Sequence, residues 1–276
     1  MRWMPVLAMA LALLLPGLAT AKGKKGHKGK QGHKKHHKKA EHAIFAGEMP
    51  QPNAHTLRKG QGQIDLFTRS HWGLTNDLQL DVTMGRFLVI GPNAGLEYAF
   101  LQNKKQAVSM SVYGQTNWRR YSQRATLMPM YTWGGHRSSR VSTGLGLEVA
   151  KWDWSRVPQE RMQKFGVAGR TEVDRTFGVP IHIGYDFVRT NRSVFQFWGS
   201  TDVAAPARDD PFKFQAGASW NHGWRTFRMS LGLTVNYNAL ADVQEVFDTL
   251  EDTFSAFDRD LPRFVPLPYA RFWWRF

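Results

Sequence analysis

The sequence predicts an all-β fold: a single closed antiparallel transmembrane β-barrel of about 12 strands, in a range of about 10 to 12, behind a disordered basic N-terminal extension. Three observations lead to this prediction. The chain is rich in aromatic residues, with 18 Phe and 11 Trp, yet no apolar run after the N-terminus is long enough for a membrane helix. Many segments alternate apolar and polar residues with period two. Residues 1–21 have the features of a secretory signal.

Residues 1–21 are expected to be a signal peptide that is cleaved near Ala21. Their apolar run, 4–15, is shorter than the roughly 20 residues that a membrane-spanning helix needs. Pro16 ends the run, and the small residues around Thr20 fit the pattern of a cleavage site. The chain contains no Cys, which excludes a lipid-modified N-terminus and a disulfide framework.

Residues 22–40 form a Lys/His/Gly-rich tail that is expected to be disordered, because it has almost nothing apolar to bury. This tail holds most of the net charge of +15, so the charge does not predict a nucleic-acid partner. Three interpretations stay open: a solvated tail, electrostatic attachment to anionic envelope polymers, and weak binding of a divalent metal. The metal ligands would be His27, His33, His36 and His37, and no other cofactor is expected.

The segment 225–238 shows the strand pattern most clearly. Its apolar face consists of Phe227, Met229, Leu231, Leu233, Val235 and Tyr237, and its other face is polar. Such segments exceed the roughly 5–6 residues of common soluble strands and match the roughly 9–11 that cross a bilayer at a tilt. The expected strands cover 61–69, 77–85, 91–101, 106–118, 125–134, 140–152, 175–188, 193–201, 211–221, 225–238 and 263–276.

That count of strands is odd, whereas single-chain bacterial barrels have an even number of strands, short periplasmic turns and longer outer loops. If residue 276 is periplasmic, the short connections between the expected strands all lie on the periplasmic side. We therefore expect a linker at 41–60 that contains a weak first strand, followed by the barrel at 61–276. Within the barrel, the connection 239–258 has apolar residues at helical spacing among acidic ones, which predicts an amphipathic helical loop.

The segments "RFWWRF" (271–276) and "HWGLTNDLQL" (71–80) resemble parts of Gram-negative outer-membrane β-barrel proteins. The first resembles their C-terminal strand and the second a periplasmic turn. The resemblance implies a location in the outer membrane, contact with its lipid, and a periplasmic N-terminal tail. It also implies recognition by the barrel-insertion machinery, for which the signal residues would be Phe272, Trp274 and Phe276.

The polar faces of the expected strands carry charges of both signs, which would line the lumen. These residues are Asp65, Asp81, Glu97, Glu148, Asp186, Lys213, Arg228, Arg271 and Arg275. They would either cross-link a filled lumen or line a selective pore. The leading function is a passive pore for small polar solutes or a structural envelope protein. The alternative is a barrel anchor whose tail or outer loops bind anionic polymers or metal.

A hydrolase at the barrel rim is a further alternative. Such an enzyme needs a serine or carboxylate within hydrogen-bond reach of a histidine. His182 and Asp186 share a strand face, but four residues along a strand span roughly 13 Å. No catalytic residues are assigned, and we expect that the chain is not an enzyme.

Overall fold

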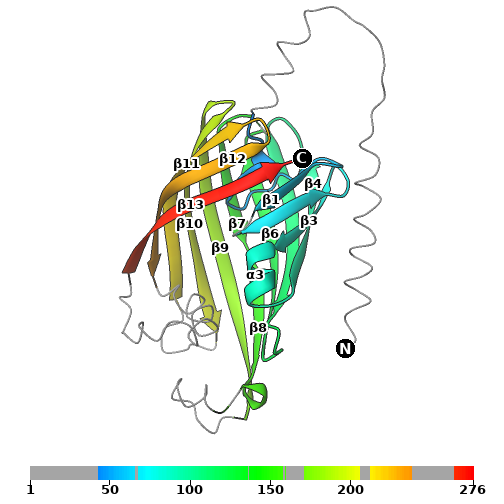
Figure 1. Cartoon of the computed structure of the whole chain (residues 1–276), viewed down its shortest axis with the longest axis vertical. Helices are drawn as coiled ribbons and strands as arrows, with labels where there is room; N and C mark the ends of the chain where they lie inside the picture. The colour runs from blue at the N-terminus through cyan, green and yellow to red at the C-terminus, as the bar shows by residue number, and fades with distance from the viewer. Residues whose placement is uncertain are drawn as a thin grey trace, which may run out of the picture. The chain divides into compact units, whose positions relative to one another are not determined.

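The computed structural model describes residues 43–65, 68–135, 137–157, 159, 171–205, 212–237 and 264–276. They form one antiparallel sheet that closes on itself (Figure 1). The expected signal peptide 1–21, the tail at 22–40 and the amphipathic loop at 239–258 lie outside the described residues. No helix among the described residues is long and apolar enough to cross a membrane.

The sheet runs through the chain in sequence order. Its strands are β1 (Gly62–Asp65), β2 (Arg69–Gly73), β3 (Leu78–Thr83), β4 (Asn93–Gln102), β5 (Gln106–Thr116), β6 (Ser122–Trp133), β7 (Arg140–Leu145), β8 (Leu147–Asp153), β9 (Val173–Thr190), β10 (Ser193–Ala205), β11 (Phe212–Trp224), β12 (Phe227–Tyr237) and β13 (Phe264–Arg275). The described helical elements are short: η1 (Ala46–Glu48), α3 (Met84–Val89) and η2 (Trp154–Arg156). Pairing of β1 with β13 closes the barrel.

Strands β7 and β8 are one strand of the barrel, because both pair with β6 on one side and with β9 on the other. The interruption lies at Gly146, whose N–H still donates to the carbonyl of Pro180 at 2.7 Å. Pro180 has no N–H to return, so the ladder loses a bond at this position. The barrel therefore has 12 strands, as the sequence predicts.

The twelfth strand is not where we expected it. Residues 43–60 contain no strand, and the short 3-10 helix η1 lies there instead. Pro50 and Pro52 each lack a backbone N–H, which disfavours a ladder in this segment. The additional strand is β2, which shares only Arg69 with the expected strand 61–69. The rest of β2 extends into the segment 71–80 that we expected to hold a turn, and the turn itself is confined to 74–77. The N–H of Thr68 donates to Asp65 Oδ1 at 2.9 Å next to the reversal between β1 and β2.

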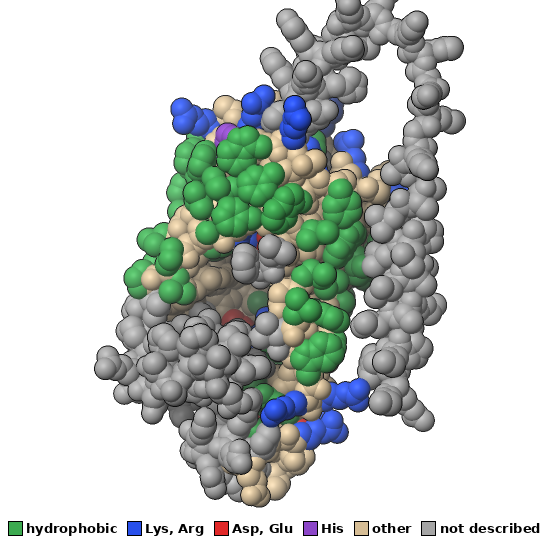
Figure 2. All heavy atoms as spheres, viewed as in Figure 1, with side chains coloured by type: hydrophobic (Ala, Val, Ile, Leu, Met, Phe, Trp, Pro, Cys, Tyr) green, Lys and Arg blue, Asp and Glu red, His purple; other side chains and the backbone are tan. Residues whose placement is uncertain are grey.

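The barrel is polar inside and apolar outside. Inward side chains such as Ser230 and Asn221 are fully buried, whereas Leu145 is 59% exposed and Ile183 is 57% exposed on the outer face. Figure 2 shows apolar side chains over the wall, with Lys and Arg gathered beyond them at both ends. A water-soluble barrel has the opposite arrangement.

Residues 43–60, which we call the plug, enter the barrel, and most of them lie in its interior. Ala46, Glu48, Ala54, His55 and Thr56 are each at most 1% exposed. The plug packs through two small apolar clusters: one joins Ile44 and Met49 to Val194 and Val188, and the other joins Ala54 to Ala107, Met130 and Met128. The expected linker is thus an internal element of the barrel.

The seam between β1 and β13 is short. Its register runs only from Gln63 opposite Arg275 to Asp65 opposite Trp273, and then β1 ends. The N–H of residue 276 points toward β1, where it donates to Gly62 at 3.0 Å. Because N–H directions alternate along a strand, Pro266 and Pro268 take positions on this same edge. They remove two donors from the stretch of β13 that β1 does not cover.

Candidate functional site: the plugged lumen

Glu48 fixes the plug to the barrel wall. From η1, its Oε1 accepts a hydrogen bond from Arg275 Nη1 at 2.8 Å, and its Oε2 lies 3.4 Å from Arg228 Nε. The side chains of Glu48 and Arg228 are completely buried. Both guanidinium groups also donate to the carbonyl of Ala43 at 3.1 Å. One buried and one partly buried cation thus share the carboxylate of Glu48. Arg228 also donates through Nη1 to the carbonyl of Phe227 at 3.0 Å.

A second ion pair holds the tip of the plug. Arg271 donates to Asp65 Oδ2 through Nε at 3.1 Å and through Nη2 at 2.9 Å. Its remaining Nη1 donates to the carbonyl of Pro50 at 2.8 Å and to the Tyr269 hydroxyl at 3.0 Å. Arg271 therefore links the first strand, the last strand and the plug tip in one buried network.

The returning half of the plug is held by side chains of the wall. The N–H of Ala54 donates to Thr132 Oγ1 at 2.8 Å. In the same way, Thr56 donates to Gln102 Oε1 at 2.8 Å and Leu57 donates to Gln79 Oε1 at 2.9 Å. Buried backbone groups need partners. Polar lumen side chains supply them here, which lets a segment without regular secondary structure lie inside the barrel.

His55 is enclosed where the plug passes the turn between β6 and β7. It is 1% exposed, and its Nε2 lies 3.0 Å from the carbonyl of Gly134, so Nε2 carries the hydrogen. Burial lowers the pKa of His55 from 6.5 to about 4, against the opposing effect of the bond to Gly134. The neutral imidazole is therefore the form that the plugged state holds.

The remaining acidic residues that we expected in the lumen have partners on neighbouring strands. Asp81 lies 2.7 Å from His71 Nδ1, and Glu97 accepts a bond from Ser109 Oγ at 2.7 Å. The other pairs are Glu148 with Arg124 at 3.2 Å and Asp186 with Arg140 at 2.6 Å. Lys213 lies on β11, but its side chain is outside the described part of the structure.

The residues of the expected assembly signal lie on β13 and just beyond it. Trp274 and Phe276 are exposed on the outer face, by 41% and 53%. The ring of Phe272 stacks on Phe227 at a centroid distance of 6.0 Å. Trp273, which alternates with them, is buried at 1% exposure. The terminal aromatics therefore divide between the outer surface and the lumen as alternation predicts.

Some lumen residues were missed in the sequence. Arg140 continues the polar face of its strand, so parity alone could have identified it. Glu48 and His55 had no such signal, because they lie outside any strand, in a segment where apolar and polar residues follow no regular period.

The four expected metal ligands, His27, His33, His36 and His37, lie outside the described residues. Within the described residues, no group of three or more His, Cys, Asp or Glu side chains is placed to hold a metal ion.

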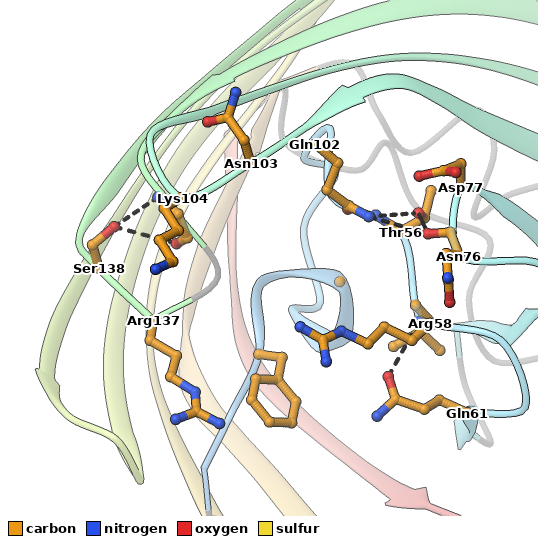
Figure 3. Close-up of a pocket in the computed structure, with 14 residues that line it drawn as sticks. Thr56, Arg58, Gln61, Asn76, Asp77, Gln102, Asn103, Lys104, Arg137 and Ser138 are labelled. Carbon is orange, nitrogen blue, oxygen red and sulfur yellow. Dashed lines mark hydrogen bonds between the residues drawn. The ribbon is translucent and has the colours of Figure 1, made fainter.

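A cavity of about 900 Å³ lies beside the plug, at the end of the barrel that carries the short turns. The plug provides part of its lining, and the turns 74–77, 103–105 and 134–139 provide most of the rest, together with Gln61 and Gln102. Arg58 extends across the space from the plug, and Lys104 and Arg137 lie on the opposite side (Figure 3). The lining contains a single carboxylate, Asp77, among its described residues.

Comparison with protein-family models, curated proteins and solved structures found no match for this chain.

Proposed function

We propose that this chain is an outer-membrane β-barrel with a closed lumen, and that it anchors its Lys/His-rich tail in the periplasm, where the tail binds anionic polymers of the envelope. The observation that carries this proposal is the position of the plug. A buried ion pair between Glu48 and Arg228 and a hydrogen bond from Arg271 to the Pro50 carbonyl hold residues 43–60 inside the barrel. The lumen is thereby filled by a segment of the chain itself.

The arrangement of the faces supports a membrane location. Large apolar side chains such as Phe177, at 59% exposure, cover the outside of the strands. Contiguous apolar surfaces of this extent are rare on soluble monomers and are typical of membrane barrels. The aromatic residues Trp220, Trp224 and Phe227 gather near the short-turn end of β11 and β12, as in an interfacial girdle.

The arrangement of the turns supports a periplasmic tail. The connections 74–77, 103–105, 134–139, 191–192 and 225–226 are short and share one end of the barrel with residue 276. Ile44 lies at that end too, because its N–H donates to the carbonyl of Asn191 at 2.8 Å. Bacterial barrels keep their short turns in the periplasm. The described chain therefore begins at the end that we propose to be periplasmic, which supports a periplasmic tail.

The competing function is a passive pore for small polar solutes. The plug argues against it, because opening the lumen would break the contacts of Glu48 with Arg228 and Arg275. It would also break the hydrogen bonds that join Ala54, Thr56 and Leu57 to the wall. We therefore expect the closed state to predominate.

Single-channel conductance of the refolded full chain in a planar bilayer tests the closed lumen. We expect no steady conductance from the natural sequence. The variant Glu48→Lys places a third cation beside Arg228 and Arg275, so the plug should detach and openings should appear. The matched control is Asp77→Lys, which reverses an exposed acid at the same mouth. Steady conductance from the natural sequence would favour the pore.

Cosedimentation with isolated murein sacculi tests the function of the tail. The full chain should bind at low salt and be released at high salt, because the attraction is electrostatic. A variant in which the nine Lys of residues 22–39 are replaced by Gln should lose this binding. Equal binding by that variant would remove the tail from the proposal.

The proposal assigns no catalytic chemistry. His71 and Asp81 are arranged like a catalytic base and the carboxylate that orients it. However, no serine hydroxyl within the described residues bonds to His71, so a nucleophile is lacking there.

A further inference from the structure

We propose that the 900 Å³ cavity beside the plug is a binding site for an oligomeric anion, such as a carboxylate- or phosphate-bearing oligosaccharide. This site is distinct from the tail, which precedes Ala43. It is built by the folded barrel itself, from the plug and from three separate turns.

The charges of the lining carry the first step of the argument. Arg58, Lys104 and Arg137 are exposed to the cavity, and none of the three makes an ion pair with a described residue. Arg137 instead lies over the ring of Phe45, at 5.1 Å from its centroid. Against these three cations the lining offers one carboxylate, Asp77. The cavity therefore has a net positive charge, which its walls concentrate.

The amide side chains of the lining point to the same chemistry. The carboxamide oxygens of Gln61, Asn76 and Asn103 accept backbone N–H groups at 3.1, 3.4 and 2.8 Å, respectively. Their NH₂ groups have no acceptor among the described residues. The polar groups left for a ligand are thus mainly donors, which select a molecule with several acceptor oxygens.

The size of the cavity excludes a single small ion as its best occupant. Ligand sites for drug-sized molecules have volumes of about 300–1,000 Å³, and this cavity lies near the upper end of that range. An oligomer of a few charged sugar or phosphate units would reach Arg58 on the plug and Lys104 on the opposite turn together. One phosphate could not.

Binding at this site would also favour the plugged state. Phe45, Gly47, Thr56, Leu57 and Arg58 belong to the plug and line the cavity. The site is therefore complete only while the plug is docked. A ligand that binds only one state stabilises that state, by an amount that rises with the logarithm of the ligand concentration above its Kd. An anionic oligomer should accordingly raise the temperature at which the barrel loses its compact, heat-modifiable form.

Isothermal titration calorimetry on the refolded full chain in zwitterionic detergent tests the proposal. The probes are trigalacturonate for carboxylates, tripolyphosphate for phosphates and maltotriose as a neutral oligomer. We expect at least one anionic probe to bind, with the tighter one identifying the charged group, and maltotriose not to bind. The double variant Arg58→Gln/Arg137→Gln should weaken binding by at least about tenfold, since each removes a charged donor.

The matched control is Arg189→Gln/Arg192→Gln, which removes two exposed cations from the same end of the barrel but not from the cavity. It should retain the affinity. Equal weakening by both double variants would show general attraction to the basic end and would overturn the site, as would binding of maltotriose. If the first double variant does not fold, Lys104→Gln gives the same test on a turn outside the plug. All these variants keep the tail, so failure here leaves the tail proposal intact.

Discussion

Glu48 and Arg228 are 180 residues apart in the sequence, yet their side chains lie 3.4 Å apart and are completely buried in the barrel. This contact makes the N-terminal segment part of the interior. Because Arg275 approaches the same carboxylate at 2.8 Å, one side chain of the plug is the shared counter-charge of two cations of the wall.

Replacing Glu48 by Gln should therefore destabilise the barrel by about 3–5 kcal/mol, because two guanidinium groups lose their buried counter-charge. Denaturant unfolding followed by the heat-modifiable shift in gel mobility measures the loss. Asp77→Asn, at an exposed acid of the neighbouring turn, should change stability by less than about 0.5 kcal/mol. Similar stability of Glu48→Gln and the natural sequence would mean that water or lipid reaches these arginines.

Acid should weaken the plugged state through His55. Its pKa is about 4 in the folded barrel against 6.5 ordinarily, so the unfolded chain binds this proton first as the pH falls. The contribution of His55 to the free energy of unfolding is complete above pH 6.5, declines between pH 6.5 and 4, and is lost below pH 4. The contribution is at most on the order of 3 kcal/mol.

The measurement is the free energy of unfolding between pH 7.5 and 4, for the natural sequence and for His55→Gln. Since the chain has 10 His, only the difference between the two curves reports on His55. The natural sequence should lose more stability than the variant below pH 6.5. Parallel curves would show that His55 is accessible to protons in the folded state.

Gly73 should not tolerate a side chain. A Cβ added there would lie 2.1 Å from the backbone oxygen of Arg58, so the end of the plug would have to move. Such overpacking costs about 1–3 kcal/mol. Gly114 is the matched site, because nothing lies within 4 Å of its added Cβ. We expect thermal unfolding to show a loss for Gly73→Ala and little change for Gly114→Ala.

Removing Phe276 should reduce the amount of barrel in the outer membrane. Residue 276 exchanges two backbone hydrogen bonds with Gly62, at 3.0 and 3.1 Å, and its ring lies over that glycine. Quantitative blotting of membrane fractions compares the deletion with Phe276→Tyr, which keeps both the backbone bonds and the aromatic ring. Normal levels after deletion would count against a role for this residue in assembly.

Deleting residues 22–39 should leave heat-modifiable folding unchanged. The contacts that hold the plug begin at Ala43, whose carbonyl accepts from Arg228 and Arg275. The shift in gel mobility of the refolded deletion variant is the measurement. A collapse of folding would mean that the tail takes part in the barrel.

The sequence predicts the wall of this barrel well, because alternation is a local property. On β12, the odd-numbered residues from Phe227 to Tyr237 face out and the even-numbered residues from Arg228 to Asn236 face in, as period two requires. Arg140 and Asp186 could be placed inside in the same way, but their contact depends on the register between β7 and β9, which no single segment encodes.

The plug could not be predicted in this way. Residues 43–60 have no period, and their role depends on polar groups of distant strands, such as Thr132, Gln102 and Gln79. The division between β1 and β2 was missed because alternation says nothing about the direction of the chain. The total of 12 strands was right, but the location of one strand was wrong.

The short seam between β1 and β13 has a consequence for how the barrel assembles and how it unfolds. The ladder between β1 and β2 is also short, with two register pairs, but residues 66–68 connect those two strands in the chain. Most other neighbouring strands share longer ladders, such as that from Phe227 opposite Trp274 to Tyr237 opposite Phe264 between β12 and β13. Fewer bonds must break to part β1 from β13 than to part those strands. The seam is therefore where the cylinder should join last during insertion and separate first on heating. With prolines along the uncovered edge, an open sheet would also be slow to recruit a neighbouring molecule's strand.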